Sequence, residues 1–251
     1  MNTNANSVQS RIIVALDVSS LETLGPLIEV LAPHVGCFKI GLELISSVGG
    51  PQAVQFIHER GGRVFYDGKF DDIPNTISKA SAAVAKLRVA MFNVHASSGV
   101  PGMKAAVDNK GEAAVLAVTV LTSHDHDASI HIFGASNEEA VAEFAKDAHS
   151  AGVDGIICSP LELSILAENE DLNGLRRITP GIRSKNAPPD DQKRTMTAAE
   201  AIMAGATELV IGRPILKSPD GLSPAEAARA FNLEIAEALQ RKASLSEGEK
   251  P

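Results

Sequence analysis

Eight apolar runs alternate with eight helical segments along almost the whole chain, and this alternation restricts the folds open to it. Apolar runs of roughly four to eight residues are typical of strands buried on both faces, as in a parallel sheet. The runs cover residues 11–17, 36–41, 62–69, 89–95, 113–121, 155–158, 177–181 and 208–213. Helical spacing follows at 21–31, 52–60, 77–87, after Pro101, and at 137–151, 160–167, 197–204 and 224–241.

Strand–helix units without any linker-like change of composition predict an α/β fold, a single-domain (β/α)8 TIM barrel. We expect residues 1–10 to form a flexible N-terminal tail, 11–242 the barrel and 243–251 a frayed C-terminal tail. A doubly wound open sheet is the alternative, but it rarely needs eight such units, and no Gly-x-Gly-x-x-Gly motif follows the first strand. Two connections, 122–136 and 182–196, are long enough to predict functional loops.

Charge, hydropathy and cysteine usage narrow the range of partners and compartments. The net charge of −8 argues against non-specific binding to nucleic acid. No apolar run approaches the roughly 20 residues that a membrane-spanning helix needs, and residues 1–7 lack the features of a signal peptide. Cys37 and Cys158 lie within apolar runs, so we predict core residues, no disulfide and a cytoplasmic location.

Charged residues gather where the first three predicted strands end. Asp17 ends the first strand, Lys39 lies near the end of the second, and Asp67 and Lys69 end the third. Active sites of β/α barrels lie at the carboxyl ends of the strands, so we expect these four side chains to converge. Asp72 follows closely enough to fold back toward them. A surface cluster of salt bridges is the alternative for an isolated Asp-x-Lys-x-x-Asp pattern.

Two arginines follow the last two predicted strands, each close behind a glycine. Arg183 follows Gly181, and Arg213 follows Gly212. The loops after strands seven and eight commonly bind phosphate in this fold, and arginine forms bidentate bonds with phosphate. The sequence therefore predicts a phosphorylated substrate.

A run of histidine and aspartate at 124–127 has residue types found in metal sites, but it lacks a distant third ligand. We interpret it as a solvated loop and predict no metal site. His95 ends the fourth strand near the predicted site, where a role as general base is open but is not needed.

Residues 67–76, Asp-Gly-Lys-Phe-Asp-Asp-Ile-Pro-Asn-Thr, closely resemble the signature of the orotidine 5′-phosphate decarboxylase family. Further matching segments, in matching order, are Val-Ala-Leu-Asp at 14–17, Lys-Ile-Gly at 39–41, Asn-Val-His-Ala-Ser at 93–97, Val-Thr-Val-Leu-Thr-Ser at 118–123, Thr-Pro-Gly-Ile-Arg at 179–183, Asp-Gln at 191–192 and Val-Ile-Gly-Arg-Pro at 210–214. Gly68 departs from the family pattern, where a bulkier apolar residue is expected, and Asp71 is an additional acid.

The resemblance implies a cofactor-free decarboxylation of orotidine 5′-monophosphate to UMP and CO2, the last step of de novo pyrimidine synthesis. It implies that Lys69 donates a proton to the pyrimidine, that Asp67 lies beside the departing carboxylate, and that Lys39 and Asp17 bind the ribose. It also implies a homodimer in which one short segment reaches the partner's site. The residues of that segment are Asp72, Ile73 and Thr76. Thr122 would meet the base or ribose, while phosphate binding and closure of the loop at 182–196 would fall to Arg183, Gln192, Gly212 and Arg213.

Two questions stay open at the level of sequence. Asp67 either presses against the substrate carboxylate, at a cost of roughly 4 kcal/mol for like charges about 4 Å apart, or keeps Lys69 charged and oriented. A Mg²⁺-dependent sugar-phosphate lyase of the same barrel group is the rival enzyme, and a non-catalytic nucleotide-binding protein is the rival from another class. The residues Ile73-Pro74-Asn75-Thr76 favour the nucleotide enzyme.

Overall fold

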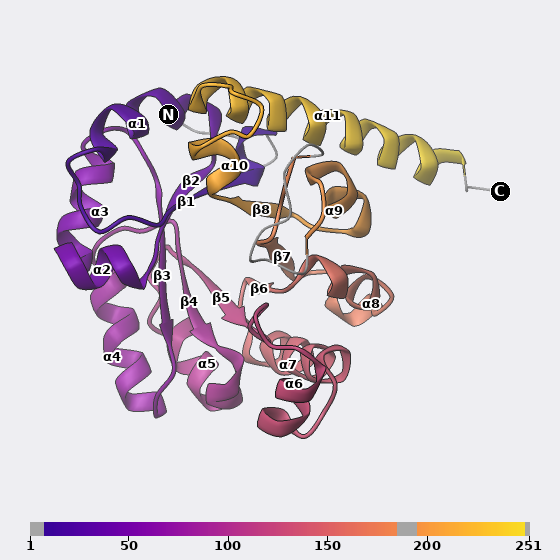
Figure 1. The fold of residues 1–251 in the computed structure, drawn as a ribbon. Coiled ribbons are helices and arrows are strands. Elements are labelled where there is room, and N and C mark those ends of the chain that lie inside the picture. The colour runs from indigo at the N-terminus through magenta and orange to yellow at the C-terminus, as the bar shows by residue number, and fades with distance from the viewer. Residues whose placement is uncertain (1–7, 185–194, 249–251) are drawn as a thin grey trace.

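Eight parallel strands close into a barrel in the order of the chain, β1 to β8, in the computed structural model (Figure 1). The structure describes residues 8–184 and 195–248. The strands are β1 Ile12–Leu16, β2 Cys37–Ile40, β3 Val64–Phe70, β4 Met91–His95, β5 Ala114–Val118, β6 Gly155–Ile157, β7 Arg176–Thr179 and β8 Glu208–Ile211. The predicted (β/α)8 TIM barrel is confirmed.

Helices surround the barrel and cover the outer faces of its strands (Figure 1). The α-helices are α1 Leu24–Leu31, α2 Leu42–Val48, α3 Gly50–His58, α4 Pro74–Ala85, α5 Gly99–Val107, α6 His126–Phe133, α7 Asn137–Ala151, α8 Leu163–Ala167, α9 Ala198–Ala204, α10 Arg213–Leu216 and α11 Pro224–Gly248. Short 3-10 turns are η1 Gln9–Arg11, η2 Ala32–His34, η3 Ala96–Ser98, η4 Pro160–Glu162 and η5 Glu170–Leu172. In the described part of the chain, no helix is both long and apolar enough to span a membrane.

Local sequence sets where several of these helices begin. α7 starts at a reciprocal pair in which the Ser136 hydroxyl accepts from the Glu139 N–H and the Glu139 carboxylate accepts from the Ser136 N–H. Thr197 and Glu200 form the same arrangement at α9. Such capping boxes satisfy backbone donors that have no partner within the helix, so these boundaries follow directly from the residues.

The alternation of side chains divides the core into two layers. On β1, Ile12, Val14 and Leu16 face the surrounding helices, while Ile13 and Ala15 face the barrel interior. The interior cluster draws one or two residues from most strands, namely Ile13, Ala15, Cys37, Phe65, Met91, Leu116, Ile178 and Val210. A barrel of this size is filled by side chains, and here all five residues of β1 are buried.

The connection at 122–136, predicted as a loop, contains helix α6. The Asp125 side chain accepts from the Ala128 N–H, and Gly134 ends the helix in the left-handed conformation at φ 74°. The aspartates that made this stretch resemble a solvated loop thus include the residue that caps a helix. Ile130 and Phe133 also carry helical spacing, a signal that the histidine–aspartate run obscured.

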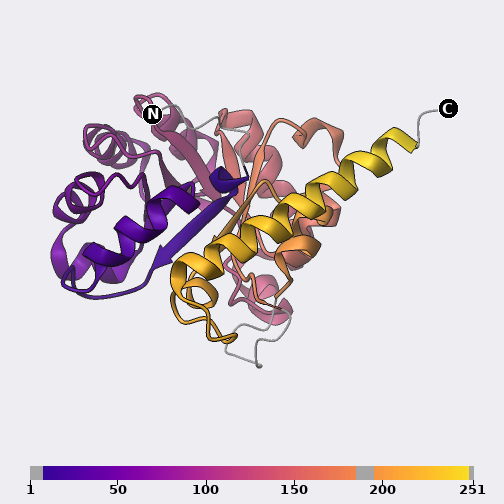
Figure 2. The ribbon, with the colours of Figure 1, turned by 90° about the horizontal axis from the view of Figure 1, so that it is seen from above.

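The last helix, α11, is longer than the sequence predicted. It lies on the outside of the barrel against α1, α9 and α10, continues beyond it (Figures 1 and 2) and ends at Gly248. Residues 243–248 are therefore helical where a frayed tail was expected. At the other end, Val8 and η1 are described, and a Cβ added at Gly36 would collide with the Ser10 carbonyl. The expected boundary at residue 10 thus falls inside a packed turn.

Candidate active site

The charged residues at the strand ends continue the inward-facing rows of the barrel core. Asp17 lies two positions after Ala15, Lys39 two after Cys37, and Asp67 two after Phe65, all of which face the interior. Because side chains alternate along a strand, the next inward positions carry charge. The barrel fold thus gathers these groups above an apolar floor.

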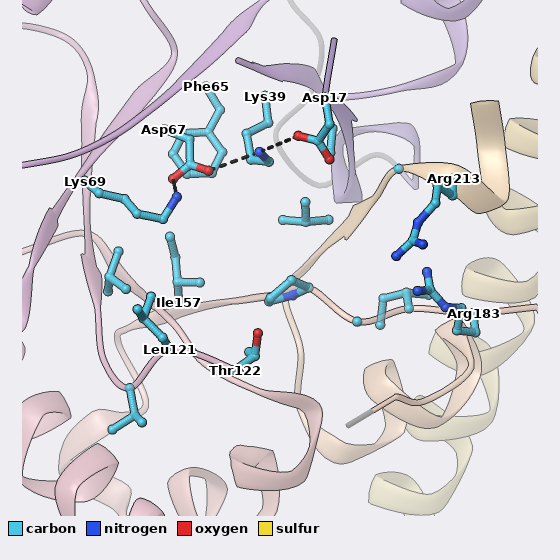
Figure 3. A pocket seen from close by; sticks show the side chains of 18 residues that line it. Asp17, Lys39, Phe65, Asp67, Lys69, Leu121, Thr122, Ile157, Arg183 and Arg213 are labelled. Carbon is cyan, nitrogen blue, oxygen red and sulfur yellow. Dashed lines mark hydrogen bonds and ion pairs between the residues drawn. The ribbon is translucent and has the colours of Figure 1, made fainter. Parts of the chain in front are cut away.

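Four charges of alternating sign meet at the mouth of the barrel (Figure 3). The Nζ of Lys69 lies 2.7 Å from Oδ1 of Asp67, and the Nζ of Lys39 lies 3.1 Å from Oδ2 of Asp67. Lys39 also lies 3.4 Å from Oδ1 of Asp17. The Asp67 side chain is only 8% exposed, whereas that of Asp17 is 67% exposed. The array therefore runs from a buried carboxylate to a solvated one.

Asn93 completes the buried end of this array, although no role in the site was assigned to it from the sequence. Its Nδ2 donates to Oδ1 of Asp67 at 2.6 Å, and its Oδ1 accepts from the Lys69 N–H at 2.7 Å. Asn93 has no exposed surface. A signal was present in the sequence, since an asparagine within an apolar strand must find partners for its amide.

The pKa values of Asp67 and Lys39 shift so that both groups remain charged. Burial alone would raise the pKa of Asp67, but Lys39 and Lys69, together with hydrogen bonds from Lys69 and Asn93, hold it below the usual value. Burial likewise acts to lower the pKa of Lys39, yet the carboxylates of Asp67 and Asp17 raise it above the usual value. The site thus holds ionised groups in a partly desolvated place, which requires such mutual pairing.

His95 lies close to the same charged residues. Burial lowers its pKa and Lys69 acts in the same direction, while Asp71 and Asp67 oppose this. Asp71 itself accepts from the Ser97 hydroxyl at 3.1 Å. The neutral imidazole is therefore favoured beside the array.

A cavity of about 270 Å³ opens next to the array and is lined on its other side by the two predicted arginines (Figure 3). Arg183 and Arg213 lie across the cavity from Lys69. Thr122 also lines the cavity and contributes a hydroxyl group. Gly212 lines the cavity where β8 gives way to α10. The remaining wall is apolar, with Phe65, Val118, Val120, Leu121, Ile157, Ile182 and Val210 among its residues.

The structure does not bring all the predicted residues into this cavity. Asp72, Ile73 and Thr76 are exposed, and none of them is among the described residues that line it. Asp72 instead accepts from the Ile73 N–H at 2.7 Å, at the start of α4, and Ile73 is 65% exposed. Gln192 lies outside the described residues.

Metal ligands are not gathered at any point in the described part of the chain. Across residues 8–184 and 195–248, no three side chains of His, Cys, Asp or Glu lie together as a metal site. In the mouth of the barrel, the ammonium of Lys39 occupies the position between the carboxylates of Asp17 and Asp67. A cation of the protein thus sits where a metal bridging these two carboxylates would have to bind.

Comparison with known proteins gives consistent matches over most of the chain. Residues 10–231 match the sequence profile described as the Orotidine 5'-phosphate decarboxylase / HUMPS family. The orotidine 5'-phosphate decarboxylase of Moorella thermoacetica is 43% identical over 238 residues, covering 90% of this chain and 92% of that protein. The protein of the same name from Geotalea daltonii is 41% identical, covering 92% of this chain and 98% of that protein.

A solved structure agrees with the sequence matches. The crystal structure of orotidine 5'-phosphate decarboxylase from Lactobacillus acidophilus superposes with a TM-score of 0.76 at 33% identity. The superposition covers 89% of this chain and 98% of that one. The similarity therefore extends over the barrel as a whole.

Proposed function

This chain belongs to the orotidine 5'-phosphate decarboxylase / HUMPS family, and from that premise we propose that it converts orotidine 5′-monophosphate to UMP and CO2 in pyrimidine biosynthesis. The observation that carries the proposal is the 2.7 Å ion pair of Lys69 with the buried Asp67 at the edge of the cavity. The substrate is an anion at both ends, and cations stand on both sides of this cavity.

The reaction breaks the bond between C6 of the pyrimidine and its carboxylate, and the electron pair stays on C6. CO2 leaves, and a proton must then reach the same carbon. An ammonium placed where negative charge develops stabilises the transition state and can supply that proton. We assign this role to Lys69, which becomes a neutral amine and takes its next proton from water. No cofactor is needed in this scheme.

Asp67 is assigned to holding Lys69 rather than to repelling the substrate. Both of its oxygens are already engaged, Oδ1 by Lys69 and Asn93 and Oδ2 by Lys39. A carboxylate with its charge offset in this way exerts little repulsion on a neighbouring anion. It does keep an ammonium charged and fixed in direction.

We assign Lys39 and Asp17 to binding the ribose. Both line the cavity, and Asp17 forms the solvated end of the array. An ammonium can donate a hydrogen bond to the oxygen of a sugar hydroxyl, and a carboxylate can accept one from its O–H. Thr122 would contribute a further hydroxyl from the opposite wall.

The phosphate is assigned to Arg183, Gly212 and Arg213, with Gln192 as a further ligand. Phosphate sites of this fold are built from the loops after strands seven and eight, and both described arginines line the cavity there. Binding energy from this remote group can be used to fix the reacting ring against Lys69.

Homodimerisation is part of the proposal, with Asp72, Ile73 and Thr76 entering the partner's cavity. Its support is that these residues are exposed and lie off the cavity of their own chain. Ile73 is among the most exposed large apolar residues described, and entry into the partner's cavity would remove its side chain from water. We place the enzyme in the cytoplasm.

The test is an absorbance assay of the purified protein on orotidine 5′-monophosphate, before and after dialysis against EDTA. We expect turnover, with UMP and CO2 as products, that EDTA leaves unchanged. Turnover of a hexulose or keto-gulonate 6-phosphate, dependent on Mg²⁺ and without reaction of the nucleotide, would reject the assignment. Binding of UMP without any turnover would identify a nucleotide-binding protein instead.

A further inference from the structure

Asn93 joins the backbone of Lys69 to the carboxylate that Lys69 binds, and we propose that it is a positioning residue for the Asp67–Lys69 pair. This inference rests on the proposed decarboxylation and deepens it. Asn93 does not line the cavity, so it would act on the substrate only through its two neighbours.

The first argument comes from a bulge in β3. Tyr66 pairs with Phe92 and Phe70 pairs with Val94, so the three residues 67–69 lie opposite the single residue Asn93 on β4. A bulge leaves backbone groups without their regular partners across the sheet. The Asn93 Oδ1 replaces one missing partner, since it accepts a hydrogen bond from the Lys69 N–H at 2.7 Å.

The backbone of Lys69 needs that support. Its φ is 49°, in the left-handed region that residues with a side chain seldom adopt. Such a conformation persists only where the surroundings determine it. The hydrogen bond that the Lys69 N–H donates to Asn93 is therefore well placed to fix the direction in which the lysine side chain leaves the strand.

The second argument comes from the other end of the same amide. The Nδ2 of Asn93 donates at 2.6 Å to Oδ1 of Asp67, the oxygen that the Lys69 ammonium also contacts. Rotation of the Asp67 carboxylate would break this bond and leave a buried amide without a partner, which is costly. One uncharged side chain thus fixes both members of the ion pair without changing the charge of the site.

A substitution pair separates positioning from simple structural support. Asn93→Leu keeps the number and branching of the side-chain heavy atoms and removes both hydrogen bonds. Asn93→Asp keeps an acceptor for the Lys69 N–H, but it can donate to Asp67 only when its carboxyl group is protonated. Asn232→Leu is the matched control, because Asn232 donates to the His34 carbonyl at 2.8 Å and does not line the cavity.

We expect Asn93→Leu to lower kcat by about 10- to 100-fold, the scale set by losing hydrogen bonds to a charged group. Its KM should change by no more than about threefold, because the phosphate ligands lie on the other wall. For Asn93→Asp, a second carboxyl group beside Asp67 shares a proton with it at raised pKa. Its kcat should therefore rise as the pH falls, a trend that wild type and Asn232→Leu lack.

The experiment is a kcat and KM series across pH, with the fraction of competent sites measured by UMP titration. If wild type does not decarboxylate the nucleotide, the proposed function fails and this inference fails with it. If wild type is active and Asn93→Leu retains its kcat, or changes only in KM, this inference alone is overturned. Should Asn93→Leu not fold, a pH profile of Asn93→Asp parallel to that of wild type would overturn it.

Discussion

The ammonium of Lys39 lies 3.1 Å from Oδ2 of Asp67, on the carboxylate oxygen that Lys69 leaves unoccupied. Two lysines thus share one buried carboxylate, one on each oxygen. The arrangement explains how two like charges stand near each other beside a cavity. It also links the stability of the barrel mouth to the ionisation of a single residue.

Asp67 should make stability depend on acid pH. Its pKa is lower in the folded chain than in the unfolded chain, where a value near 3.9 is usual. Its contribution is therefore present above about pH 4 and is lost as the pH falls through the folded pKa. We expect the difference in unfolding free energy between wild type and Asp67→Asn to shrink below about pH 4. Urea unfolding at several pH values measures this; a difference that does not vary with pH would contradict it.

Lys69→Ala should abolish decarboxylation and preserve binding of UMP. The substitution removes the proposed proton donor but leaves Arg183 and Arg213 in place. Turnover should fall by at least about 10³-fold, since proton transfer and charge stabilisation are lost together. Lys79→Ala, at an exposed lysine of α4, is the control and should behave as wild type. Substantial residual turnover in Lys69→Ala would refute the assignment of the donor.

Arg213→Ala should weaken recognition of the phosphate specifically. A charge-assisted bond to phosphate is worth roughly 1.5–3 kcal/mol, so UMP affinity and kcat/KM should fall about 10- to 100-fold. Affinity for uridine, which lacks the phosphate, should not change. Calorimetric titration with both ligands measures the contrast, and exposed Arg241 provides the control variant Arg241→Ala. Equal losses for UMP and uridine would place the phosphate elsewhere.

Gly68 and Tyr66 should prove to be energetically coupled. A Cβ at position 68 would lie 2.7 Å from Cε1 of Tyr66 and 3.0 Å from Cε1 of Phe70. Gly68→Ala should therefore destabilise the fold by about 1–3 kcal/mol through overpacking. In the background of Tyr66→Val, the same substitution should cost at least about 1 kcal/mol less. A double-mutant cycle by thermal unfolding tests this, and additive effects would contradict it.

Mixing two inactive variants should restore activity if Asp72 acts in the partner's site. In a dimer of one Lys69→Ala and one Asp72→Asn chain, one cavity contains both the intact Lys69 and the intact Asp72. Random pairing of equal amounts should return about a quarter of wild-type activity, since half the dimers are mixed and each has one intact site. Mixtures that stay as inactive as their components would place Asp72 in its own chain's site.

Much of the candidate site could be predicted from the sequence, because the strand ends of a barrel lie next to one another. Asp17, Lys39 and Asp67 each stand two positions after an inward apolar residue, so alternation alone brings them together. Asn93 was assigned no role in the site from the sequence, because its contacts depend on a bulge in β3. A bulge changes which residues face each other, and no pattern of period two reveals it.

The sequence also did not reveal why Gly68 departs from the family pattern. Two aromatic rings, Tyr66 and Phe70, occupy the space next to it, with ring centroids 6.2 Å apart. Those residues are close in the chain but meet only because the strand bulges between them. Likewise α6 was hidden because its capping aspartate stands within a histidine–aspartate run of polar residues.

The exposed segment at 72–76 has a consequence for how this protein would have to be handled. If each cavity needs side chains from a second chain, only the dimer is active. Specific activity should then decline once the enzyme is diluted below the dissociation constant of the dimer. The amount of protein in the assay would then set the measured rate per chain. In the cell, expression level would regulate flux more steeply than in simple proportion.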